Sequence, residues 1–222
     1  MTIIIYGAAA SSFVRTVRMA AHEKGLDYEL GQVGDGTVGA LGSPDHRKLH
    51  PFGKIPVFTD GKVTLWESMA ICRYIDEAYE GKALQPDDVL ERARMEQWIS
   101  AGLDYVIPQA IRNYVQQYVF PSGPNGQPDM AKINEAKPKI REAMLIMDKE
   151  LEGRTWLAGD DVSIADLLFA PVLTYVGQMP DGMEAFDGCQ NLYRWWEAVT
   201  ALESYKATVP DGVPGSATQA AE

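Results

Sequence analysis

A change of pattern near residue 86 limits the possible folds of this chain more than any other feature. Before it, short β-branched runs alternate with helical patterns; after it, strand-like runs vanish and long helical periodicities take over. A chain of 222 residues, 46% of them apolar, can build two small domains. The sequence therefore predicts an α/β domain over residues 1–81, an all-helical domain over 88–209 and a flexible tail over 210–222.

The first part shows the order β-α-β followed by β-β-α. Asp60-Gly61 is a strong hairpin signal because glycine adopts positive φ readily, and Gly7 opens a turn between a strand and a helix. The expected elements are strands at 3–6, 27–33, 55–58 and 63–65, helices at 11–24 and 67–79, and an irregular stretch with one short helix at 34–50.

The second part shows helical periodicity throughout. Ser163 followed by Asp166 has the spacing of a capping box, which marks a helix start. Pro108 lies inside one long apolar pattern and is expected to kink it. The expected helices cover about 88–119, 133–151, 163–173 and 191–202.

Charge and cysteine content exclude several classes of function. The chain has 20 Lys and Arg residues against 31 Asp and Glu residues, a net charge of −11, with no basic stripe, which argues against nucleic acid and anionic membranes. No apolar run is long enough for a membrane helix or preceded by a basic signal region. Cys72 and Cys189, without a CxxC motif, predict a cytoplasmic protein with no disulfide framework and no metal site.

Three segments in the right order carry a family resemblance. "PFGKIPVFTDG", "LWESMAICRYI" and "LAGDDVSIADLLFAPVL" are similar to segments of the cytosolic glutathione transferases, of the serine-using type found in theta-like, phi-like and bacterial members. The resemblance covers nearly the whole chain. It implies an α/β thioredoxin-like N-terminal domain that binds glutathione, followed by an all-α C-terminal domain, and usually a homodimer.

The resemblance also implies a function. The expected enzyme is a glutathione transferase of detoxification, which conjugates glutathione, its co-substrate, to a small hydrophobic electrophile and needs no metal. Serine-type members of the family also include enzymes that reduce peroxides, remove halide or cleave ethers. A glutathione-binding module of the same fold without turnover is a further hypothesis, and so is a disulfide reductase. The reductase is disfavoured because the loop "AAASS" lacks the cysteine that such enzymes use.

Three hydroxyls compete for activation of the glutathione thiol. The thiolate is the nucleophile, so a hydrogen-bond donor at a helix N-terminus has a clear chemical use. "SSFVR" resembles the family pattern Ser-Pro-Phe-Val-Arg, in which Ser11 matches the functional serine and Ser12 the proline. Tyr6 ends the first strand, where other classes carry a tyrosine. Ser11 is the preferred candidate, although a serine there also suits a plain N-cap.

Five further residues are candidates for binding glutathione, and all except Lys54 match binding positions of the family. Ile55 precedes Pro56, which the family keeps cis, and its backbone pairs with the cysteinyl part of glutathione. Glu67 matches the acid that meets the γ-glutamyl ammonium, and Ser68 the hydroxyl that meets the carboxylate. Lys54 could face the glycyl carboxylate. Taken alone, each of these residues also suits an ordinary turn or helix start.

Two other groups carry weaker hypotheses. A small positive cluster, His46, Arg47, Lys48 and His50, could hold an anion, but a solvated loop is the preferred interpretation. In the kinked helix, an apolar, tyrosine-rich wall could receive a hydrophobic electrophile, although core packing would also explain it. That wall consists of Ile107, Ile111, Tyr114 and Tyr118.

Overall fold

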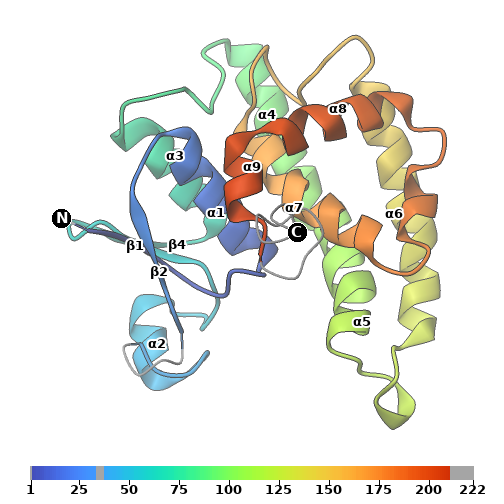
Figure 1. The fold of residues 1–222 in the computed structure, drawn as a ribbon, viewed down its shortest axis with the longest axis horizontal. Coiled ribbons are helices and arrows are strands. Elements are labelled where there is room, and N and C mark those ends of the chain that lie inside the picture. The colour runs from blue at the N-terminus through green and yellow to red at the C-terminus, as the bar shows by residue number, and fades with distance from the viewer. Residues whose placement is uncertain (1, 34–37, 211–222) are drawn as a thin grey trace, which may run out of the picture. The chain divides into compact units, whose positions relative to one another are not determined.

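The computed structural model describes residues 2–33 and 38–210. Its internal contacts divide the chain into two units, each drawn in Figure 1. The first unit consists of the chain up to Gln85 together with the chain from Ala201 on, and the second is Pro86–Thr200. A small sheet with helices in the first unit and helices throughout the second confirm the predicted fold class.

The first unit is organised around a four-stranded mixed sheet. Its strands are β1 (Ile3–Tyr6), β2 (Tyr28–Gly31), β3 (Val57–Thr59) and β4 (Thr64–Trp66), in the order β2-β1-β3-β4. β1 runs parallel to β2, and β3 runs antiparallel to both β1 and β4. Both ends of each strand lie within two residues of the ends predicted from the sequence.

The described part of the same unit contains four helices: α1 (Ser12–Glu23), α2 (Pro44–Leu49), α3 (Ser68–Ala78) and α9 (Glu203–Thr208). α1 and α3 pack against each other beside the sheet. Asp60 fixes the hairpin to α3: its carboxylate accepts hydrogen bonds from the Lys62 and Val63 amides and from the hydroxyls of Tyr74 and Tyr79. The turn that the Asp60-Gly61 pair predicts is thus also a tertiary anchor.

The second unit contains helical segments of three kinds. Its α-helices are α4 (Val89–Ala101), α5 (Gln116–Val119), α6 (Met130–Glu150), α7 (Ile164–Gln178) and α8 (Gln190–Ala201). Between α4 and α5 lie two π-helical stretches, η1 (Gly102–Val106) and η2 (Pro108–Val115); two 3-10 turns are η3 (Pro124–Gly126) and η4 (Gly182–Phe186). The single kinked helix expected over 88–119 is therefore interrupted by wide turns. Pro108 begins η2, where its missing N–H removes no bond within that stretch.

α7 is the central helix of the second unit, and almost every residue in it is buried. The Asp166 carboxylate, fully buried near its start, accepts hydrogen bonds from the Leu157 and Ser163 amides, the Ser163 hydroxyl and the Trp195 indole. The predicted capping box is present and also ties α8 to α7. Among the described residues, no helix combines the length and hydropathy that crossing a bilayer would require.

α9 departs from the sequence-based domain limits. The sequence assigns residues 203–209 to the helical domain, but α9 packs against α1 and belongs to the first unit. Buried Arg15 explains this, because its guanidinium donates to carbonyls of the last turn of α9. Of the predicted tail, 210–222, the structure describes Pro210, which is buried; residues 211–222 lie outside the described residues.

Candidate functional site

Three segments that are distant in sequence meet at one end of the sheet, where β1 and β4 end and β3 begins. We call this end the sheet edge. In the register of the strands, Tyr6 at the end of β1 faces Val57 at the start of β3, and Val57 faces Trp66 at the end of β4. The segments adjoining these three residues must therefore lie side by side. They are the turn 7–11, the dipeptide 55–56 and the dipeptide 67–68, which contain most of the predicted glutathione-site residues.

Gly7 allows the first two segments to approach closely. Its φ of 151° lies in the range that favours glycine. A Cβ placed on Gly7 would come 2.4 Å from Val14 Cγ2 and 3.2 Å from Ile55 Cβ. The turn between β1 and α1 thus passes directly against Ile55, and only a residue without a side chain fits there.

Ser11 and Ser12 occupy different environments. Ser11 is the N-cap of α1, with φ −69° and ψ 125°, and its Oγ accepts from the Val14 amide at 3.4 Å. Its side chain is half-buried, so part of it faces solvent at the positive end of the helix. Ser12 is the first residue of α1 and is only 6% exposed. Of the two residues, Ser11 therefore keeps the larger exposed fraction.

Tyr6 alternates in burial with Ile5 along β1, so the two side chains lie on opposite faces of the sheet. The Tyr6 ring lies over Gly31 on the neighbouring strand, where an added Cβ would come 2.5 Å from the ring. The absence of a side chain at Gly31 thus makes room for this ring. Packing across β2 accounts for the position of Tyr6.

The segment before β3 changes from exposed to buried within three residues. Lys54 is exposed, Ile55 is half-buried and Pro56 is buried. The Ile55-Pro56 peptide bond is cis, as the family resemblance implies. Since β3 begins only at Val57, the backbone of Ile55 lies beyond the end of the strand ladder at the shared edge.

Glu67 has the least favourable backbone conformation at this edge. Its φ of 70° and ψ of 113° are uncommon for a residue with a side chain, and such conformations gather at functional sites. The Glu67 side chain is exposed, while Ser68, which begins α3, is 5% exposed. No side chain caps the start of α3 within the described structure. The first amides of α3 therefore remain suited to an anionic group.

The cluster at 46–50 is not the solvated loop that the sequence favours. Arg47 and Lys48 are exposed, but His46 and His50 are almost completely buried. The Gly42 amide donates to His46 Nδ1 at 2.9 Å, and the His50 ring packs 5.3 Å from the Trp66 ring. Burial lowers the pKa of His50, and the nearby charge of Glu67 partly opposes this. Packing of the His50 ring on Trp66 and the hydrogen bond from Gly42 to His46 thus accompany the burial of two of the four basic side chains.

The predicted electrophile residues lie in the second unit. Ile107 and Tyr114 are buried, whereas Ile111 and Tyr118 are half-buried. The Tyr114 hydroxyl donates to the Pro180 carbonyl at 2.5 Å, and burial raises the pKa of this phenol well above its usual value. Tyr114 is therefore used to pack the unit. Of the four residues, Ile111 and Tyr118 retain surface that a ligand can contact.

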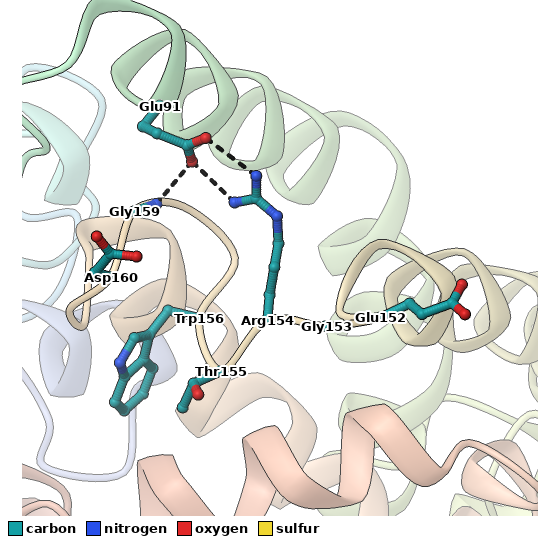
Figure 2. Close-up of a pocket in the computed structure, with 8 residues that line it drawn as sticks. All are labelled: Glu91, Glu152, Gly153, Arg154, Thr155, Trp156, Gly159 and Asp160. Carbon is teal, nitrogen blue, oxygen red and sulfur yellow. Dashed lines mark hydrogen bonds and ion pairs between the residues drawn. The ribbon is translucent and has the colours of Figure 1, made fainter.

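A separate hollow of about 570 Å³ lies in the second unit (Figure 2). Arg154 and Glu91 line it and form a two-pronged ion pair, with N···O distances of 2.9 and 3.0 Å. Its lining consists of Glu91, Glu152, Gly153, Arg154, Thr155, Trp156, Gly159 and Asp160. Because Arg154 is already paired with Glu91, we interpret the charged residues that line this hollow as a structural ion-pair network.

Comparison with known proteins identifies the family of both parts of the chain. Residues 5–83 match the family model for the N-terminal domain of glutathione S-transferase, and residues 106–203 match the model for the C-terminal domain. A probable glutathione S-transferase GSTF1 of Oryza sativa subsp. japonica is 33% identical over 91% of this chain and 93% of its own length. Glutathione S-transferase 3 of Zea mays is 32% identical over 92% of each chain.

Solved structures are similar over the same extent. The crystal structure of poplar glutathione transferase F1 has a TM-score of 0.83 and 32% identity, covering 94% of this chain and 96% of that one. A theta-class glutathione S-transferase from the citrus canker pathogen Xanthomonas axonopodis pv. citri, solved with glutathione bound, has a TM-score of 0.82 and 27% identity over 96% and 99% of the two chains. This chain therefore belongs to the glutathione S-transferase family.

Proposed function

We propose that this glutathione transferase binds glutathione at the sheet edge formed by 7–11, 55–56 and 67–68, ionises its thiol and transfers the sulfur to a hydrophobic electrophile. The convergence of these three segments carries the proposal. The sulfur forms a bond to an electrophilic carbon, and either a halide leaves or the addition product takes up a proton. Relatives with glutathione or a glutathione conjugate bound support this class of reaction.

Ser11 is the proposed donor to the thiolate. A free thiol has a pKa of about 8.5, and lowering it by about two pH units requires roughly 2.7 kcal/mol. One charge-assisted hydrogen bond supplies about 1.5–3 kcal/mol, and a helix N-terminus adds about 0.3–1 kcal/mol. A hydroxyl at the N-cap of α1 offers both contributions. The burial of Ser12 and the packing of Tyr6 over Gly31 favour Ser11 over both of these residues.

The rest of glutathione is proposed to follow the edge. The Ile55 backbone, left beyond the β3 ladder next to cis Pro56, pairs with the cysteinyl peptide. The exposed Glu67 carboxylate binds the γ-glutamyl ammonium, and the uncapped amides of α3 with Ser68 bind its carboxylate. Lys54, exposed beside Ile55, faces the glycyl carboxylate. These local donors offset the repulsion expected from a net charge of −11.

Two broader properties belong to the same proposal. Ile111 and Tyr118 provide the apolar contact surface for the electrophile. A homodimer in the cytoplasm is supported by large apolar side chains left exposed, including Phe52, Val89 and Tyr105, and by two buried free cysteines. Light scattering of the purified chain should give twice the monomer mass of 24.5 kDa. A monomeric mass would contradict the proposed dimer but not the proposed glutathione site.

Paired serine variants test the central assignment. In Ser11→Ala, the pKa of the bound glutathione thiol, measured by thiolate absorbance, should rise from about 6.5 to about 8.5, and turnover at pH 7 should fall roughly 25-fold, because the thiolate fraction at that pH falls from about 76% to about 3%. Ser12→Ala is the matched control and should change neither quantity. An unchanged thiol pKa in Ser11→Ala removes Ser11 from this role.

Glu67→Gln tests the binding half of the proposal. The variant keeps the shape of the side chain but loses the charge that pairs with the ammonium, so calorimetry should show glutathione binding at least tenfold weaker, with roughly 1.4 kcal/mol lost. S-methylglutathione, which has the same ammonium but no thiol to ionise, should lose affinity equally. Equal affinity in wild type and variant contradicts the assignment of Glu67.

A further inference from the structure

Arg15 is a fully buried arginine on the helix that begins at Ser11. Its Nε donates to the Thr208 carbonyl at 3.1 Å, and one terminal nitrogen donates to the Tyr205 carbonyl at 3.5 Å. The guanidinium carbon lies 4.6 Å from the centre of the Tyr205 ring. These partners all come from α9, whose last turn presents carbonyls that favour a cation. Burying a charge this deeply is costly, so its position is closely specified.

The place of Arg15 in α1 connects these contacts to the glutathione site. The Arg15 amide donates to the Ser11 carbonyl at 2.9 Å and so closes the first turn of the helix. Residues four apart lie on one face of a helix, and long side chains point back toward its N-terminus. The Ser11 hydroxyl itself is held within the described structure by a long contact, 3.4 Å, with the Val14 amide. The backbone of the first turn must therefore set the direction of that hydroxyl.

α9 is attached at several points along α1. The Thr208 carbonyl that accepts from Arg15 also accepts from Arg18 at 3.5 Å. Near the other end of α1, the Ser204 hydroxyl donates to Glu23. α9, about 190 residues away in sequence, is thus hydrogen-bonded to the helix that begins after Ser11. Of these three attachments, the one at Arg15 lies closest to Ser11 along the helix.

We infer that Arg15 is a positioning residue for the Ser11 hydroxyl, through which α9 becomes a functional part of the glutathione site. This inference rests on the proposed role of Ser11. By clamping the first turn of α1 to α9, Arg15 holds the hydroxyl in the direction that donates to the sulfur. Its buried positive charge also strengthens the favourable field at the helix start, because a low-dielectric surrounding screens it little.

Substitutions of Arg15 separate positioning from overall stability. In Arg15→Met, the pKa of the bound glutathione thiol should rise by about one pH unit, and kcat at pH 7 with a chloroaromatic electrophile should fall about threefold, because the thiolate fraction falls from about 76% to about 24%. The Kd of S-methylglutathione should stay within about twofold of wild type, because this ligand has no thiol to ionise. Arg15→Lys, which keeps the charge but not the forked geometry, should recover part of both losses.

Arg18→Met is the matched control, since Arg18 bonds the same Thr208 carbonyl from a position further along the helix. It should lower the melting temperature without moving the thiol pKa. If Arg15→Met does not fold, Tyr205→Leu removes the ring beside the guanidinium and should raise the thiol pKa in the same direction.

The outcomes also distinguish this inference from the proposed function. A wild-type thiol pKa in folded Arg15→Met, Arg15→Lys and Tyr205→Leu, with a raised pKa in Ser11→Ala, would overturn the role of Arg15 alone. A parallel loss of S-methylglutathione affinity and kcat would assign Arg15 to structure rather than to positioning. A wild-type pKa in Ser11→Ala would overturn both proposals.

Discussion

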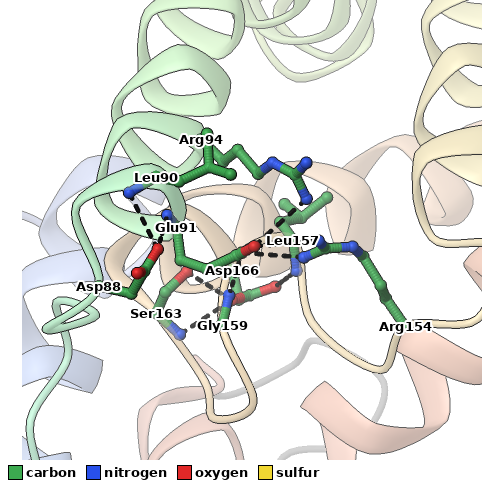
Figure 3. A network of polar contacts seen from close by, with 9 residues as sticks. All are labelled: Asp88, Leu90, Glu91, Arg94, Arg154, Leu157, Gly159, Ser163 and Asp166. Carbon is green, nitrogen blue, oxygen red and sulfur yellow. Dashed lines mark hydrogen bonds and ion pairs between the residues drawn. The ribbon is translucent and has the colours of Figure 1, made fainter.

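Replacing Glu91 by glutamine should destabilise the second unit in a pH-dependent way. In Figure 3 the Glu91 carboxylate lies at the centre of a network that links the start of α4 to the segment between α6 and α7. It accepts from Arg154 at 2.9 and 3.0 Å, from the Gly159 amide at 2.8 Å and from Arg94 at 3.2 Å. The Arg154 guanidinium, followed by the Gly159 amide, lowers the pKa of Glu91 from 4.5 to about 2.

The magnitude follows from that difference. At about 1.4 kcal/mol per pH unit, a change from 4.5 to about 2 corresponds to about 3 kcal/mol. The Glu91 and Arg154 side chains are 21% and 26% exposed, so solvent screening reduces the expected stabilisation to about 1.5–2 kcal/mol. Because the folded-state pKa lies below the unfolded one, this contribution is complete above pH 4.5 and is lost as the pH falls toward 2.

Urea denaturation of wild type and Glu91→Gln at about pH 7 and pH 3.5, followed by tryptophan fluorescence, measures the effect. The variant should be less stable by about 1.5–2 kcal/mol at pH 7, and about 40% of this difference should disappear at pH 3.5. Glu135→Gln is the control: Glu135 pairs with Lys139 on the surface of α6 and is 73% exposed, so its loss should be undetectable. A Glu91→Gln deficit that is equal at both pH values, or absent at pH 7, refutes the reasoning.

Three further substitutions test contacts within each unit. Asp166→Ala should lower the free energy of unfolding by about 3 kcal/mol in calorimetry, because it leaves buried donors without an acceptor; a loss below about 1 kcal/mol would contradict this. Lys24→Met should cost about 3–5 kcal/mol in urea denaturation, since the Lys24–Asp76 pair at 3.2 Å is buried and Asp76 would keep an unpaired charge; a neutral result would show that water reaches Asp76. Gly7→Ala should weaken glutathione binding in titration calorimetry, because its Cβ would clash with Val14 and displace the turn; unaltered affinity would argue against close approach at the edge.

Much of the fold could be predicted from local patterns. The β-branched run at 3–6, the Asp60-Gly61 turn and the Ser163–Asp166 spacing each act over a few residues, and each produces the expected element. Ser11 could likewise be predicted as an N-cap, because serine is a favoured residue immediately before a run of helical periodicity. The proposed glutathione-site residues could be selected only by resemblance, since each also suits an ordinary turn or cap.

By itself, the sequence determined the order of elements, the change from mixed to helical structure and the identity of the hydroxyl at the start of α1. The tertiary structure decided which segments meet. Strand register brings residues 7–11, 55–56 and 67–68 to one edge of the sheet, and the sequence of a single segment does not indicate which other strand it pairs with. It also decided the strained backbone of Glu67, the burial of His50 and the return of α9 to Arg15. These features depend on contacts between residues far apart in the chain, whereas the periodicity of a sequence reports only on neighbours a few residues away.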